Sequence, residues 1–127
     1  MIIFAIFAWL QHEDDNPEIY FDPSIADAWS WIIFYGLVSA SFLLACFNKF
    51  PKWLYFLAAI MAIYFMAFSV HGLMENLSNG EFNMSKNAMN PKQPYVEITR
   101  EFFGALIALS AIGYLYWHSR KNHAASR

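Results

Sequence analysis

The chain has 127 residues, of which 58% are hydrophobic, 20% aromatic and only 14% charged. A soluble domain carries about 25% charged residues, so most of the surface of this chain must face lipid rather than water. The net charge of −2 argues against nucleic acid as a partner, and the single Cys46 excludes an internal disulfide. The length predicts one domain over residues 1–127.

Four apolar stretches predict four helices. We expect them at about residues 1–11, 25–47, 52–76 and 95–119, with loops at residues 12–24 and 77–94. A helix needs about 20 apolar residues to cross a hydrocarbon core of about 30 Å. The first stretch rises only about 16 Å, so its helix begins inside the bilayer or upstream of Met1. The sequence therefore predicts an all-α, four-helix integral membrane bundle whose first helix is short or truncated.

Residues at the helix boundaries support these limits. Ser24 and Asp27 form a capping-box pattern, in which the Ser24 hydroxyl accepts a backbone N–H at the start of the second helix. Pro51 and Pro94 suit the first turns of the third and fourth helices. Glu97 then lies in the first turn of the fourth helix, where the helix dipole favours a negative charge.

The charges divide between the two sides of the predicted membrane domain. All ten acidic residues fall near the two longer loops, whereas Lys49, Lys52, Arg120, Lys121 and Arg127 lie on the opposite side. Lys and Arg near helix ends mark the cytoplasmic side. We therefore expect both termini in the cytoplasm and the acidic loops outside it, in a plasma membrane or a bacterial inner membrane.

The fourth helix has a predicted internal face. Gly104 and Ala108 follow Glu97, Arg100 and Glu101 at helical spacing. Small residues let a neighbouring helix approach closely in a membrane. If Gly104 and Ala108 face the bundle, the three charged residues point inward at its outer end.

The other helices bring further polar residues to the same depth. The candidate ligand-binding residues are Gln11, Asp15, Tyr35, Arg100 and Glu101, and the candidate metal ligands are His71, Glu75 and Glu97. Imidazole and carboxylate groups suit several divalent metals, whereas an arginine can hold a phosphate or carboxylate group with two hydrogen bonds. The cofactor is thus open between a divalent metal and a bound lipid. Alternatively, these residues pair with one another in an ion-pair network without a ligand.

The predicted membrane core contains no Asp, Glu, Lys or Arg. An ionisable residue inside the membrane is the usual mark of an ion path or a proton relay, so its absence argues against transport. The serines in the core have no nearby base, which argues against a serine hydrolase. No catalytic residue is predicted.

Two motifs resemble those of the transmembrane protein 220 family. Residues 11–17 (QHEDDNP) with Trp31–Gly36 (WIIFYG) resemble the loop and helix start of that family, and Glu97–Ile107 (EITREFFGALI) resembles the opening of its last helix. The resemblance implies a four-helix integral membrane protein and carries no biochemical activity with it. It singles out the following residues: Gln11, Asp15, Tyr35, Glu97, Arg100 and Glu101.

Two functions fit these observations. The first is a non-catalytic accessory or scaffold subunit of a larger membrane complex, which would pack through the small residues Gly36 and Ala40 or Gly104 and Ala108. The alternative is an extracytoplasmic protein that binds a metal, a lipid or a small anion at the outer polar residues, with an enzymatic role at this site left open. The partners are accordingly membrane lipid and other membrane-protein subunits. A binding site should order the loop at residues 78–93 over its mouth, whereas a scaffold need not.

Overall fold

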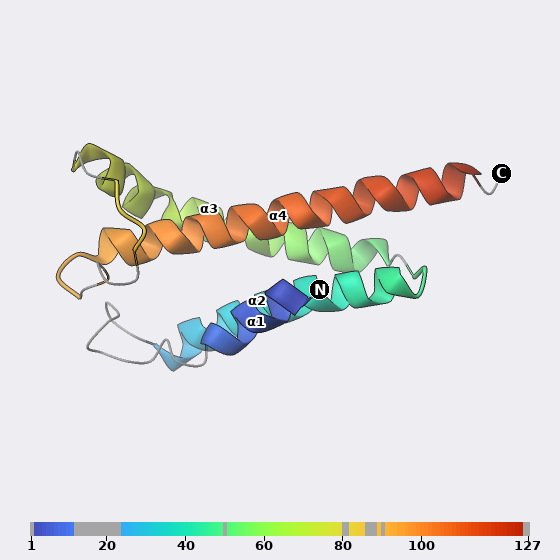
Figure 1. Ribbon diagram of the computed structural model, residues 1–127, viewed down its shortest axis with the longest axis horizontal. Helices are drawn as coiled ribbons and strands as arrows, with labels where there is room; N and C mark the ends of the chain where they lie inside the picture. The colour runs from blue at the N-terminus through green and yellow to red at the C-terminus, as the bar shows by residue number, and fades with distance from the viewer. Residues whose placement is uncertain are drawn as a thin grey trace.

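The computed structural model describes residues 2–11, 24–49, 51–79, 82–85, 89 and 91–125, with side chains up to Lys121. These residues form four helices and no strand (Figure 1): α1 (Ile2–Leu10), α2 (Ile25–Cys46), α3 (Lys52–Ser78) and α4 (Pro94–Ala125). The predicted all-α, four-helix architecture with a short first helix is confirmed. Compared with the expected limits, α3 continues to Ser78 and α4 continues to Ala125.

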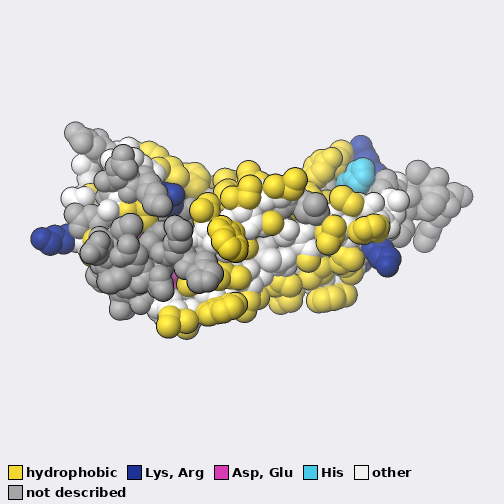
Figure 2. Space-filling model, turned by 60° about the horizontal axis from the view of Figure 1, so that its bottom comes forward, with side chains coloured by type: hydrophobic (Ala, Val, Ile, Leu, Met, Phe, Trp, Pro, Cys, Tyr) yellow, Lys and Arg dark blue, Asp and Glu magenta, His cyan; other side chains and the backbone are white. Residues whose placement is uncertain are grey.

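Three of the helices are long and apolar enough to cross a membrane: α2, α3 and the Pro94–Lys121 part of α4. The nine residues of α1 rise only about 14 Å, less than half of a hydrocarbon core of about 30 Å. Large apolar side chains such as Trp53, Ile60 and Phe68 are more than 60% exposed. Figure 2 shows apolar side chains across the middle of the molecule and Lys and Arg side chains toward its ends. This surface suits lipid.

Consecutive helices run in opposite directions along the bundle (Figure 1). The most extensive helix contact joins α3 to α4, while α1 packs on α2, and α2 contacts both α3 and α4. The turn between α2 and α3 lies at one end of the molecule, together with the end of α4. The other end holds the end of α1 and the beginnings of α2 and α4, and we call it the loop end. Polar residues from several helices can therefore meet there.

The two ends of α2 are formed differently. Ser24 is the N-cap residue, but its side chain makes no capping hydrogen bond, so that part of the capping-box prediction is wrong. Its carbonyl instead accepts the first backbone bond, from Ala28 N–H at 3.0 Å. At the other end, Asn48 has a positive φ of 56°, and Lys49 N–H reaches the Leu44 carbonyl at 2.9 Å. This is a Schellman ending, in which asparagine takes the position usual for glycine.

Aromatic rings fill part of the space between the helices along the bundle. Trp31 of α2 stacks on Phe65 of α3 with ring centroids 4.1 Å apart. Phe4 of α1 lies 6.4 Å from Tyr35 and 5.8 Å from Phe42, both on α2. Since aromatic pairs add attraction beyond the area they cover, these contacts join α1 to α2 and α2 to α3.

The α3–α4 contact depends on small side chains. On α3, Ala58 and Ala62 are fully buried, as are Ala105 and Ala108 on α4. Toward the loop end, Gly72 packs so closely on α4 that a Cβ atom there would lie 2.5 Å from Cβ and Cγ2 of Ile98. Small residues at such positions allow two membrane helices to come together.

We predict that Gly72→Ala destabilises the protein. The added methyl group cannot avoid the branched side chain of Ile98, and overpacking of this kind typically costs about 1–3 kcal/mol. Thermal unfolding in mild detergent measures the effect. Gly113→Ala is the matched control, because nothing lies within 4 Å of a Cβ at Gly113. An equal effect of the two substitutions would contradict close packing at Gly72.

Candidate functional site

Two of the predicted site residues, Tyr35 and Glu101, lie at the same part of α4, within one helical turn along that helix. Tyr35 is only 4% exposed, and its hydroxyl fits against α4 where Gly104 leaves no side chain in the way. Glu101 is half-buried one turn before Gly104 on the same side of α4. The expectation that Gly104 and Ala108 face the bundle agrees with this contact and with the complete burial of Ala108.

A third helix contributes Ser69, which was not predicted. Its hydroxyl donates a hydrogen bond to Glu101 Oε2 at 3.3 Å, and its side chain is 1% exposed. Tyr35, Ser69 and Glu101 therefore bring α2, α3 and α4 together at one place. With the neighbouring Arg100, we call these residues the loop-end cluster.

Arg100 has an unusual partner. Its guanidinium Nη1 donates to the sulfur of Met89 at 3.1 Å, although a thioether is only a weak acceptor. Among the residues that the structure describes, no carboxylate is paired with Arg100. The alternative in which Glu97 and Glu101 neutralise Arg100 therefore finds no support in these residues.

Part of the loop before α4 is held against α3 and α4. The side-chain amide of Asn76 bonds to both backbone groups of Asn83, donating to its carbonyl at 2.8 Å and accepting from its N–H at 3.1 Å. Phe82 makes an edge contact with Phe103 of α4, with ring centroids 6.3 Å apart. With Met89 on Arg100, three contacts fix described parts of this loop over the beginning of α4.

Asn76 is itself fixed by Thr99, and both side chains are fully buried. Asn76 Nδ2 donates to Thr99 Oγ1 at 3.0 Å. The Thr99 hydroxyl lies 2.6 Å from the carbonyl of Tyr95 and 3.2 Å from the carbonyl of Gly72. These bonds satisfy polar groups that would be costly to bury alone, and they fix α3 against α4 at the loop end.

Among the other candidates, His71 and Glu75 occupy a different side of α3 from Ser69. His71 and Glu75 are exposed on α3, and His71 Nδ1 lies 2.8 Å from the Phe68 carbonyl of its own helix. Glu97 is half-buried in the first turn of α4. No group of three or more His, Cys, Asp or Glu side chains among the described residues could hold a metal ion. Gln11 is half-buried directly after α1, and Asp15 lies outside the described residues.

The spacing of small and polar residues on α3 could have found Ser69 and Asn76. Ser69, Gly72 and Asn76 recur at intervals of three and four residues and continue the buried stripe of Ala58, Ala62 and Phe65. His71 and Glu75 have the same helical spacing but occupy a different side of the helix.

Comparison with known proteins agrees with this architecture. The family described as "Transmembrane family 220, helix" matches residues 3–117, a range that includes parts of all four helices and the whole loop-end cluster. The chain belongs to this family. No curated protein and no solved structure matches the sequence. The resemblance found in the sequence is thus confirmed, and the chain is an integral membrane protein of transmembrane family 220.

We predict that Gly104→Ala destabilises the protein and that Tyr35→Phe relieves the damage. The atom that blocks a methyl group at Gly104 is the Tyr35 hydroxyl oxygen, and phenylalanine lacks it. Thermal unfolding of the two single variants and the double variant forms a mutant cycle. The account predicts a higher midpoint for the double variant than for Gly104→Ala alone, and a lower or equal midpoint would contradict the contact.

We also predict that Asn76→Ala releases residues 82–85. The substitution removes both bonds to Asn83 and leaves Thr99 without its donor, at a cost of about 1–3 kcal/mol. Hydrogen–deuterium exchange should then be faster at the Asn83 amide. Asn79→Ala, at an exposed position at the end of α3, serves as the control and should leave this exchange unchanged. Unchanged exchange in Asn76→Ala would exclude the proposed anchoring.

Proposed function

We propose that this protein binds an anionic group, a lipid headgroup or a small anion, at the loop end of the bundle through Arg100. The observation that carries the proposal is the half-buried guanidinium whose hydrogen-bond partner is a methionine sulfur. A guanidinium forms its strongest bonds with carboxylate or phosphate, often two in parallel. An anion would therefore form stronger hydrogen bonds with Arg100 than the Met89 sulfur does.

The position of Arg100 supports a ligand from the membrane surface. The apolar run from Phe102 to Trp117 begins two residues after it, so Arg100 lies where α4 leaves the hydrocarbon and enters the headgroup region. Lys and Arg predominate at the opposite end of the bundle, which supports placing this end outside the cytoplasm.

The contacts of the nearby loop also support a binding site over a scaffold. Met89, Phe82 and Asn83 are held against α3 and α4 beside the loop-end cluster. An anchored loop of this kind is expected at the mouth of a binding site, and Met89 could leave Arg100 when a better acceptor arrives.

We predict that Arg100→Gln lowers retention of anionic ligands by about tenfold or more, because a hydrogen bond to a charged group is worth about 1.5–3 kcal/mol. Native mass spectrometry of the full chain, released from nanodiscs that contain phospholipid, measures the retained lipid. Inorganic phosphate titrated in detergent distinguishes a free anion from a lipid headgroup. Arg120→Gln, at an exposed position near the other end of α4, is the control. Equal retention by both variants and the unaltered protein would rule out Arg100 as the anion site.

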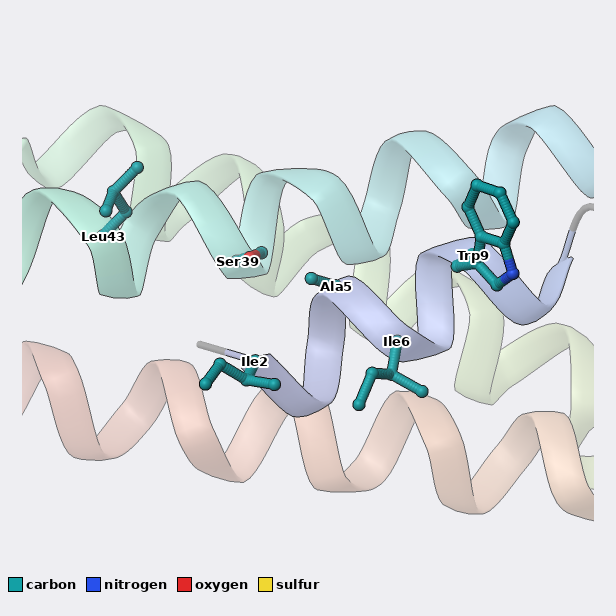
Figure 3. A pocket seen from close by; sticks show the side chains of 6 residues that line it. All are labelled: Ile2, Ala5, Ile6, Trp9, Ser39 and Leu43. Carbon is teal, nitrogen blue, oxygen red and sulfur yellow. The ribbon is translucent and has the colours of Figure 1, made fainter.

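A second candidate function, the accessory subunit, is favoured by an apolar groove beside α1. The groove has a volume of about 500 Å³ and six lining residues (Figure 3): Ile2, Ala5, Ile6, Trp9, Ser39 and Leu43. On α2, one turn from Ser39, Gly36 is exposed, with nothing within 4 Å of a Cβ built on it. In contrast, Gly104 and Ala108 pack against other helices inside the bundle. Gly36 with Ala40 therefore offers a partner helix a surface of small residues.

We predict that a photo-crosslinking amino acid at Gly36 captures a partner helix if the protein is an accessory subunit. The crosslinker should be activated in native membranes, since detergent can strip weak partners. The same amino acid at Gly113, an exposed glycine of α4, controls for random encounters. Crosslinking to lipid alone at both positions would exclude a partner at this surface.

A further inference from the structure

The two charged members of the loop-end cluster are consecutive on α4. Arg100 and Glu101 have Cα atoms about 3.8 Å apart, and their side chains leave the helix about 100° apart. Arg100 contacts Met89 of the loop, whereas Glu101 accepts a hydrogen bond from Ser69 of α3. The opposite charges are therefore held by different partners and are not paired with one another.

This arrangement affects which anion fits. A group that carries only negative charge would be attracted by Arg100 and repelled by the neighbouring Glu101. A group with a phosphate and an ammonium close together would have an opposite charge for each. The Glu101 carboxylate has two oxygens that accept about four hydrogen bonds, so its bond from Ser69 is compatible with further donors.

The depth of the pair suggests where such a group comes from. The residues from Phe102 to Trp117 rise about 24 Å within the membrane, and Arg100 and Glu101 come directly before them. At this boundary a phospholipid presents both its phosphate and its headgroup amine. The apolar surface below the pair, which includes the 49% exposed Ile107, is suited to acyl chains.

We infer that the ligand is a phospholipid whose headgroup carries a primary ammonium, with its phosphate at Arg100 and its ammonium at Glu101. A primary ammonium has three N–H donors for the carboxylate, whereas a quaternary ammonium has none. The inference rests on the proposed anion site at Arg100 and adds the specificity for the amine.

A lipid competition tests this inference. The full chain is placed in nanodiscs with equal amounts of phosphatidylethanolamine, phosphatidylcholine and phosphatidylglycerol, and the retained lipids are measured by native mass spectrometry. We expect about tenfold enrichment of phosphatidylethanolamine over the other two. Glu101→Gln should abolish the preference for phosphatidylethanolamine over phosphatidylglycerol. Arg100→Gln should lower the retention of all three lipids.

The outcomes separate the two proposals. If Arg100→Gln loses all phospholipids while Glu101→Gln keeps the preference of the unaltered protein, the amine assignment is wrong and the anion site stands. If Arg100→Gln retains phospholipids as well as the unaltered protein does, both the anion site and the amine assignment are wrong. N-methylated derivatives of phosphatidylethanolamine give a test on the unaltered protein, in case Glu101→Gln does not fold. Retention should decrease with each methyl group, and equal retention across the series would overturn the inference.

Discussion

Close contact between α3 and α4 sets the geometry on which the other features depend. In a membrane, apolar side chains gain little by leaving lipid for another helix, so association depends on close packing and on polar bonds. Gly72 lets Ile98 approach within packing distance of the α3 backbone. Only at that separation can Thr99 of α4 lie 3.2 Å from the carbonyl of Gly72 and accept a bond from Asn76. Packing and hydrogen bonding therefore act at the same few residues.

The loop-end cluster follows from this contact. Once α3 and α4 are fixed, Ser69 lies opposite Glu101 and bonds to it. The side-chain amide of Asn76 also bonds to Asn83 of the loop. The buried ring of Tyr35 then brings α2 to the gap at Gly104. Arg100 is left on the side of α4 that the loop covers, where a sulfur atom is its partner. The proposed ligand site rests on these fixed helices and on the weak acceptor that Arg100 has in the loop.

The sequence predicts the helices and three of the four residues of this cluster: Tyr35, Arg100 and Glu101. Long apolar runs reveal α2, α3 and α4 because crossing a bilayer requires them. The small residues Gly104 and Ala108 also identify the inner side of α4 correctly. Tyr35 and Glu101 are found for the same reason, since they lie at helical spacing from residues that face the interior.

The inner side of α3 was harder to predict. A helix in lipid is apolar on its outer side as well, so hydrophobic periodicity does not distinguish the two sides. His71 and Glu75 are the ionisable residues of this part of α3, but the buried face is marked by Ser69, Gly72 and Asn76. The bond between Arg100 and Met89 joins residues 11 positions apart through the path of a loop, which no local pattern specifies.

The most direct measurement is the contact between Arg100 and a lipid phosphate in the membrane. Arg120 and Arg127 are the only other arginines in the chain, so replacing both with lysine leaves Arg100 as the single site for ¹⁵N-arginine labelling. Solid-state NMR in phospholipid bilayers can then detect dipolar coupling between the guanidinium nitrogens and phosphorus. The account predicts clear dephasing of the Arg100 signal by ³¹P. A signal without dephasing, in bilayers where the chain is folded, would contradict the assignment of Arg100 as the headgroup site.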